Sequence, residues 1–233
     1  MLNLLAKLRA ISIRIILIFA NFPQRLLRLV LHLCYPFTRF YFKPNLYVII
    51  DGWLDWIAFI PFYAIDLLGI SEFYEIINEL INWEIRDIQS HEILMAKEIF
   101  KEDFQIELVR INSRNRIAKK LRIAYVSFRQ INFSESIPND VFVHELVHIW
   151  QYQNFGAVYI YKSWKAQISK EGYNYGSIKG LTEAFEKSKK FYEFNFEQQA
   201  EIIQDFYKAQ FQKHKIEEGF VFEEYLNEMN LVG

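Results

Sequence analysis

The sequence predicts a helix-dominated α+β fold, in which a small β-sheet or hairpin precedes a helix with an H-E-x-x-H motif and an amphipathic helical segment forms the N-terminus. Three observations predict it. Apolar residues recur with the helical period in several segments, and the pattern changes to alternation within residues 104–133. The 233 residues are 52% hydrophobic and 18% aromatic, which is sufficient for a sizeable core.

Charge divides the chain into two predicted parts, residues 1–70 and residues 71–233. Seven of the 27 Lys and Arg lie in residues 1–50, which contain no Asp or Glu, and the rest of the chain has 20 basic residues against 28 acidic ones. A basic segment joined to an acidic body indicates two different roles. The single cysteine, Cys34, is interpreted as a small apolar core residue. It excludes an intramolecular disulfide and a cysteine-based zinc ribbon, so a metal site must use His, Asp or Glu.

Residues 1–22 and 24–34 are predicted to form two amphipathic helices that break at Pro23. Each has a narrow polar stripe on an otherwise apolar surface: Asn3, Lys7, Arg14 and Asn21 in the first, and Arg25, Arg28 and His32 in the second. Neither helix offers the roughly 20 apolar residues that cross a bilayer. We therefore expect helices in the plane of a membrane surface, with Arg and Lys on anionic lipid headgroups and Trp53 and Trp56 at the acyl boundary.

This arrangement would make the protein a peripheral or monotopic membrane protein, on the cytoplasmic face. Two alternatives stay open. The helices can instead form a layer that packs on the body or on a protein partner in a complex. A cleavable signal peptide is the other alternative, although no small-x-small cleavage site follows "IILIFANFPQ".

The next segments are predicted to be helices over residues 71–89 and 91–100, followed by two strands. Ser71 is the expected N-cap of the first helix, and His91 is interpreted as a solvated or capping residue. Alternation over residues 104–111 and 121–133 predicts the strands, joined by the basic turn "NSRNRIAKK". One face of the first helix carries Phe73, Ile76, Ile77, Leu80 and Ile81.

The segment "VFVHELVHIWQ" is predicted to lie on a helix that Asn139 or Asp140 caps and Gly156 ends. His144 and His148 are four residues apart, so both imidazoles project from one face and can share one zinc ion. Glu145 lies too far round the helix to ligate with them, but it can reach a metal-bound water as a general base. The alternative is a buried helix with two core histidines.

A second helix, "FNFEQQAEIIQDFY" at residues 194–207, offers the missing ligand. Glu197 and Glu201 are also four residues apart on an apolar helix, where two carboxylates need partners. We assign Glu197 as the third zinc ligand and Glu201 as the acceptor of a hydrogen bond from a ligand imidazole. The two roles can be exchanged, and a pair of surface glutamates is the third possibility. His214 lies in a charged stretch and is interpreted as a surface residue.

The segment "EGYNYGSIKG" between the two helices offers a hydroxyl donor. Glycines flank Tyr173 and Tyr175, and a tyrosine hydroxyl in such a loop can stabilise the oxyanion of a tetrahedral intermediate. Tyr175 is the candidate for this catalytic role. The alternative is a packed aromatic loop.

The motif pair H-E-x-x-H and E-x-x-x-E resembles that of the gluzincin type of zinc metallopeptidase. More narrowly, "AKEIFKEDFQIELVRI", "HELVHIWQYQ", "YNY" and "FEQQAEII" resemble the bacterial Vgr-related (Rhs element Vgr) zinc peptidases. The pieces occur in the family's order over about residues 91–207, and Lys101 departs from the glycine expected after Phe. The resemblance implies a zinc peptidase without a defined substrate, and it does not cover the first seventy residues.

The expected function is therefore hydrolysis of a peptide or protein substrate by zinc-activated water, next to a membrane. The alternative is a non-catalytic, membrane-associated structural or assembly subunit with a structural or vestigial metal site. Nucleic acid is excluded as a partner, because the body is acidic and the basic N-terminal residues lie among Leu and Ile.

Overall fold

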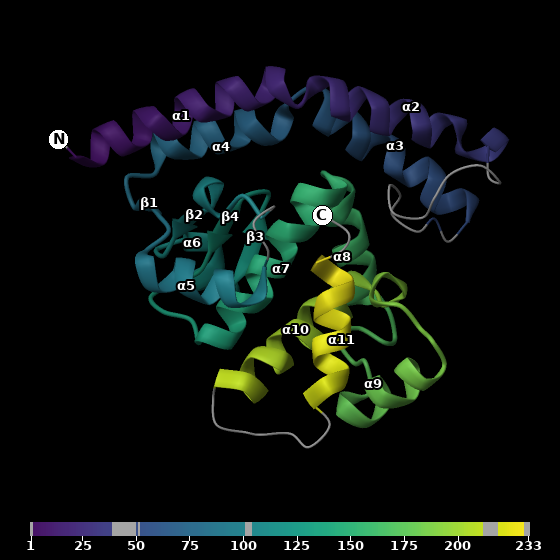
Figure 1. The fold of residues 1–233 in the computed structure, drawn as a ribbon. Coiled ribbons are helices and arrows are strands. Elements are labelled where there is room, and N and C mark those ends of the chain that lie inside the picture. The colour runs from purple at the N-terminus through teal and green to yellow at the C-terminus, as the bar shows by residue number, and fades with distance from the viewer. Residues whose placement is uncertain (1, 39–49, 51, 101–103, 212–218, 231–233) are drawn as a thin grey trace.

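Four long helices lie as a bent layer across one side of a mixed body in the computed structural model, which describes residues 2–38, 50, 52–100, 104–211 and 219–230 (Figure 1). We call this layer the arch. It consists of α1 (Leu2–Ala20), α2 (Phe22–Thr38), α3 (Trp53–Leu67) and α4 (Ile70–Ile81). Helix α1 packs along α4, and α2 packs along α3. The predicted helix-dominated α+β fold with a helical N-terminal segment is confirmed.

The arch turns its polar side inward. The charged residues of the two N-terminal stripes, Lys7, Arg14 and Arg25, are buried, and His32 is fully buried between α2 and α3. They meet an acidic stripe on α4, because Lys7, Arg14 and Arg25 pair with Glu79, Glu75 and Glu72 at 3.4, 2.8 and 2.5 Å. The basic stripes therefore bind carboxylates of this chain rather than facing solvent.

Helix α4 differs from the helix predicted over residues 71–89. It ends at Ile81, and β1 (Ile85–Asp87) follows. Ser71 is not its N-cap, because the left-handed Gly69 precedes the helix and Ser71 is buried inside it. The prediction of the helix end was wrong because a three-residue strand is too short to show a period, and only its pairing with a distant strand defines it. The prediction of the cap was wrong because the helix begins one residue earlier, directly after Gly69.

The sheet has the strand order β1-β2-β4-β3, with β2 (Arg110–Asn112), β3 (Tyr125–Ser127) and β4 (Gln130–Asn132). Strands β2 and β4 are parallel, and the other two pairs are antiparallel. The strands predicted over residues 104–111 and 121–133 are much shorter than expected, because Ile106–Leu108 forms a 3₁₀ turn and a hairpin bend divides the second segment. The predicted basic turn contains a helix, α6 (Arg116–Leu121), which the Asn115 side chain caps.

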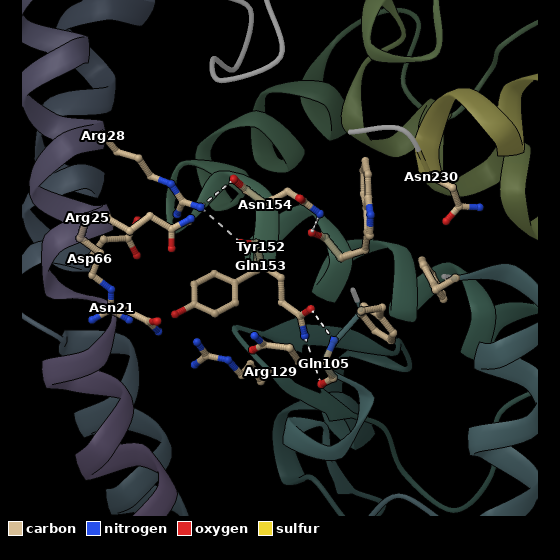
Figure 2. Close-up of a pocket in the computed structure, with 15 residues that line it drawn as sticks. Asn21, Arg25, Arg28, Asp66, Gln105, Arg129, Tyr152, Gln153, Asn154 and Asn230 are labelled. Atoms are coloured by element: carbon tan, nitrogen blue, oxygen red, sulfur yellow. Dashed lines mark hydrogen bonds between the residues drawn. The ribbon is translucent and has the colours of Figure 1, made fainter. Parts of the chain in front are cut away.

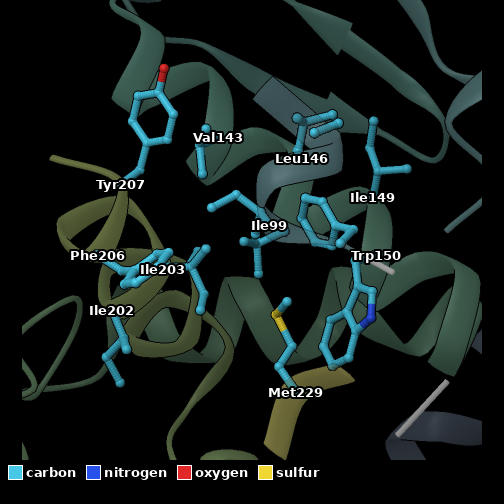
Figure 3. Close-up of a cluster of buried hydrophobic side chains, with 14 of the residues drawn as sticks. Ile99, Val143, Leu146, Ile149, Trp150, Ile202, Ile203, Phe206, Tyr207 and Met229 are labelled. Atoms are coloured by element: carbon cyan, nitrogen blue, oxygen red, sulfur yellow. The ribbon is translucent and has the colours of Figure 1, made fainter. Parts of the chain in front are cut away.

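Helix α7 (Asn139–Phe155) runs through the centre of the body, and α10 (Phe196–Phe211) packs along it. Around them lie α5 (Ser90–Ile99), α8 (Val158–Ile168), α9 (Ser177–Glu186) and α11 (Gly219–Asn230). Figure 3 shows Val143, Leu146 and Ile149 of α7 in one buried cluster with Ile203 of α10 and Met229 of α11.

The ends of α7 agree only in part with the sequence analysis. The predicted end is confirmed, because Gly156 follows the last helical residue with φ 71°. The predicted cap was wrong: Asn139 and Asp140 lie in the first turn, and Pro138 occupies the N-cap position without a side-chain hydrogen bond. Proline locks its own backbone near φ −65°, a value that leads directly into a helix.

The contact between the arch and the body is in part apolar, where Phe59 and Tyr63 of α3 share a buried cluster with residues of α8, and in part polar. A cavity of about 250 Å³ lies between α2 and the C-terminal part of α7, and Figure 2 shows Arg25, Arg28 and Asp66 around it, facing Tyr152. Arg28 donates a hydrogen bond to the carbonyl oxygen of Asn154 at 2.9 Å. Polar groups of the arch are thus satisfied by the body, which attaches the two parts firmly to each other.

Candidate metal centre

Helices α7 and α10 bring the three predicted ligands together. His144 and His148 lie one turn apart on α7, and Glu197 lies in the first turn of α10. Their ligand atoms lie within 4.8 Å of one another, and all three side chains are buried. This group can hold a metal ion.

The distances within the group fit a tetrahedral ion. The Nε2 atoms of His144 and His148 each lie 3.4 Å from Oε2 of Glu197. Two bonds of about 2.0–2.1 Å at a tetrahedral angle place their ligand atoms about 3.3–3.4 Å apart. Charge-assisted hydrogen bonds are shorter, at about 2.7–2.9 Å, and Oε2 of Glu197 has no hydrogen-bond partner. The spacing therefore matches ligands of one ion better than direct ion pairs.

Two glutamines orient this group. Gln151 is fully buried, and its amide nitrogen donates to the oxygens of Phe196 and Gln199 at 2.9 and 3.0 Å. Its amide oxygen therefore faces Nδ1 of His148, at 2.8 Å. Nδ1 then carries the proton and Nε2 is free to ligate. Gln167 of α8 donates to Oε1 of Glu197 at 2.8 Å, which leaves Oε2 for the ion.

Sequence reasoning missed both glutamines. Gln151 had a detectable signal, since it lies three residues after His148 on the same helix face. Gln167 had none, because only the packing of α8 against α10 brings it to Glu197.

The ligands perturb one another in the metal-free chain. Burial by itself lowers the pKa of His148, but the carboxylate of Glu197 outweighs it and raises this pKa to about 9. Burial likewise raises the pKa of Glu197, but the charges of His148 and His144 hold it well below its ordinary value. A proton is therefore shared within the group, and a metal ion that binds there displaces it.

Glu145 lies beside the ligands on α7, with 5% of its surface exposed. Burial raises its pKa, and the neighbouring histidines His144 and His148 offset only part of this effect. Its Oε2 atom is buried without a hydrogen-bond partner. A buried carboxyl group with a raised pKa next to a candidate metal group is suited to accept and to donate a proton.

Glu201 lies on the far side of His144. Its Oε2 atom is 3.7 Å from Nδ1 of His144, the nitrogen opposite the one that faces Glu197. Burial raises the pKa of Glu201. Of the two glutamates, Glu197 thus faces both Nε2 atoms. Glu201 lies behind one histidine, but the hydrogen bond expected between them is absent, because Nδ1 of His144 has no hydrogen-bond partner.

The structure places Tyr173, rather than Tyr175, beside the metal group. The hydroxyl of Tyr175 donates to Asp205 at 2.6 Å. The ring of Tyr173 lies 5.9 Å from that of His144. Burial, followed by the charges of Glu197 and Glu145, raises the pKa of Tyr173 to about 12. In an extended segment, side chains two residues apart point to the same side. Tyr173 and Tyr175 instead lie in an irregular loop and contact different groups, and the sequence pattern does not reveal this difference.

The other histidines do not join this group. His91 is exposed, and His32 is buried in the arch. His214 lies outside the described residues. The polar cavity beneath the arch is likewise separate, because none of the three ligands lines it.

The site is defined by its chemistry: two histidines from one helix and one carboxylate from a second form a buried group that could hold a metal ion. Comparisons of the chain with protein-family models, with curated proteins and with solved structures find no match.

Proposed function

We propose that this protein is a zinc-dependent metallopeptidase, in which His144, His148 and Glu197 hold the ion and Glu145 transfers protons. The 3.4 Å spacing of the ligand atoms is the observation that carries the proposal. Two imidazole nitrogens and one carboxylate oxygen at tetrahedral spacing suit zinc. The resemblance of the two helix motifs to gluzincins supports the same conclusion.

Each side chain has a defined task in this proposal. Zinc, when bound, supplies a Lewis acid that brings the pKa of a water molecule towards neutrality. Glu145 accepts a proton from the attacking water and donates it to the leaving amine. Tyr173 donates its hydroxyl proton in a hydrogen bond to the carbonyl oxygen of the substrate, where negative charge develops. Gln151 and Gln167 keep His148 and Glu197 in ligating orientation.

Catalysis is favoured over a purely structural role by the number of ligands. Structural zinc sites use four protein ligands, whereas catalytic sites use three and keep one position open. Within the described part of the chain, the group has three members. A second buried carboxylate, Glu145, is present but lies next to His144 on the helix, where it cannot ligate together with both histidines.

The substitution Glu145→Gln tests the proton-transfer role. We expect the variant to retain one zinc per chain by elemental analysis and to lose cleavage of a randomised library of quenched fluorescent peptides. The wild-type protein should cleave members of the library and stop when the zinc is removed. An active Glu145→Gln variant would contradict the mechanism.

A second measurement tests the open position without a substrate. In the cobalt-substituted protein, acetohydroxamate should bind the ion and change the visible absorption spectrum. A spectrum that does not respond to acetohydroxamate would identify a closed, structural site.

A further inference from the structure

The outer face of the arch is apolar, and no part of the chain that the structure describes covers it. Of 33 large apolar side chains exposed in the described residues, 22 lie between Leu4 and Trp83, so the exposure is concentrated on this layer. They line all four helices: Leu4, Leu5, Leu8, Ile15, Ile16, Phe19, Phe22, Leu26, Leu27, Val30, Leu33, Trp53, Leu54, Ile57, Leu68, Ile70, Phe73, Tyr74, Ile77, Leu80, Ile81 and Trp83. Soluble monomers rarely expose an apolar patch of more than a few hundred Å².

The charged side chains of the arch lie mainly on its inner side, opposite the apolar face. Among the charged residues of 2–38 and 52–83, eight are buried on the inner side: Lys7, Arg14, Arg25, Asp55, Asp66, Glu72, Glu75 and Glu79. Arg9 is the one charged residue of these ranges that is exposed. The arch therefore has a charged interior and an apolar exterior, the reverse of a helical layer that faces water.

The charged inner side is bound to the body. Arg14 donates to the carbonyl oxygen of Leu108 at 2.6 Å, and Glu72 and Glu75 accept from Arg129. Asp55 pairs with Lys165 of α8 at 2.8 Å. Both halves of the arch hold the body through these contacts, and Figure 1 shows the four helices as one bent layer on one side of the body. The exposed apolar side chains therefore lie on the side of the arch that faces away from the body.

We propose that this apolar face inserts into the acyl region of a lipid bilayer, with the arch in the plane of the membrane. A face that binds a protein normally carries polar groups that pair with those of the partner, since even obligate interfaces are only about two-thirds apolar. Acyl chains require no hydrogen bonds, and this face offers almost none. Trp53 and Trp83 are exposed at opposite ends of the layer, at the start of α3 and after α4, as in the aromatic belts of membrane proteins.

The arch lies in the membrane plane rather than across it. Within the described residues, no helix alone has the length and hydropathy of a span, and α3 and α4 reach them only together, with a 56° bend between them. Their inner faces carry Asp55, Asp66 and Glu75, which are paired with the body. Moving these carboxylates into lipid would break the pairs and expose charges to hydrocarbon, at a high cost in free energy.

A basic segment adjoins the arch and is suited to contact headgroups. It begins at Arg114, which pairs with Glu84 at 3.1 Å, and it reaches Ser127, which contacts Tyr74 of α4 at 3.4 Å. Between these two anchor points it exposes four basic residues and three apolar ones: Arg116, Lys119, Lys120, Arg122, Ile117, Leu121 and Ile123. We therefore assign the attraction of anionic lipid to α6 and its flanks, because Lys7, Arg14 and Arg25 are paired with carboxylates of α4.

Flotation of the full chain, made by cell-free synthesis with vesicles, tests the proposal. The wild-type chain should float with vesicles of phosphatidylcholine alone, and more strongly when phosphatidylglycerol is added. The arch variant Ile16→Gln, Phe19→Gln, Leu54→Gln and Leu80→Gln should lower the partition coefficient about a hundredfold or more, because it removes four apolar side chains from the bilayer. These residues are exposed, so the substitutions disturb no packing.

The matched control replaces four exposed apolar residues of the body: Leu94→Gln, Trp164→Gln, Ile168→Gln and Phe211→Gln. It should float like the wild-type chain. Equal metal content in all three proteins shows that each is folded, and it is independent of lipid binding. The variant Lys119→Glu/Lys120→Glu should lose only the increase caused by phosphatidylglycerol; an unchanged increase would overturn the role of α6.

Three results would overturn insertion itself. One is a wild-type chain that floats with neither vesicle type. The second is an arch variant that floats as well as the wild-type chain. The third is a wild-type oligomer that does not bind vesicles and that the arch variant converts to monomers, which would assign the face to a second copy of the chain.

Discussion

Glu197→Gln is the substitution that separates the two possible third ligands. Gln167 donates its amide N–H to Oε1 of Glu197. A glutamine at position 197 would therefore turn its own oxygen to Gln167 and its amide nitrogen to His144 and His148. That amide has no lone pair to offer to a metal ion, so one of three ligands is lost while the volume of the side chain is kept.

The expected loss follows from the strength of zinc sites. Four-ligand sites bind zinc with about 10–16 kcal/mol, or about 2.5–4 kcal/mol per ligand, which is a factor of about 100 to 1,000 in affinity. Glu201→Gln is the matched control on the same helix. Its contact with Nδ1 of His144 is 3.7 Å long, so we expect about a tenfold loss, the lower end of the range for groups that orient ligands.

Competition with a chromophoric chelator at neutral pH measures both affinities. Removal of zinc with a chelator should also lower the melting temperature of the wild-type protein more than that of Glu197→Gln, because a ligand stabilises only the fold that binds it. The reasoning is refuted if Glu201→Gln weakens zinc binding more than Glu197→Gln does, or if Glu197→Gln binds zinc like the wild-type protein.

Two other substitutions test the contact between the arch and the body. Gly156→Ala should lower the free energy of unfolding by more than about 1 kcal/mol, because Gly156 has φ 71° and an added Cβ would overlap the carboxylate of Asp66; thermal unfolding measures this, and an unchanged melting temperature would contradict it. Glu72→Gln should destabilise the protein by about 3–5 kcal/mol near neutral pH, because it removes the carboxylate that pairs with buried Arg25 and one of the two carboxylates that pair with buried Arg129. Burial raises the pKa of Glu72, but Arg129 and Arg25 lower it overall. Its stabilisation is thus complete above the unfolded-state pKa of about 4.3 and is lost as the pH falls through the lower folded-state value. The difference between wild-type and Glu72→Gln melting temperatures should shrink as the pH falls below about 4, and a difference independent of pH would show that the charge of Glu72 is not responsible.

Helices were predictable where a local period extends over several turns. Residues 141–155 and 194–207 show this, since each segment alone indicates a helix and each places its two candidate ligands on one face. The strands were not predictable at the same level. Each has three residues, and Arg110–Asn112 becomes a strand because Gln130–Asn132 and Ile85–Asp87 lie on either side of it.

Local sequence patterns likewise did not predict which side of the arch faces the body. Periodicity placed Lys7 and Arg14 on one stripe, but a stripe has no inside or outside until a second element packs on it. The carboxylates of α4, far along the chain, supply the partners and turn the stripe inward. An isolated basic stripe facing lipid headgroups was a reasonable expectation from residues 1–50, and the contacts with α4 give those side chains a different environment.

The sequence by itself determined most of the helical content, the pair His144 and His148 with Glu145 beside them, and the two candidate glutamates of the second helix, because helix period and i, i+4 spacing are local properties of the chain. Tertiary structure alone decided that Glu197 rather than Glu201 faces both histidines, that Tyr173 rather than Tyr175 lies beside them, and that Gln167 orients the carboxylate. These outcomes depend on how α7, α8, α10 and the loop before α9 pack together. Such packing brings side chains from different segments to within a few ångströms of one another, and the spacing of residues along one segment does not specify those contacts.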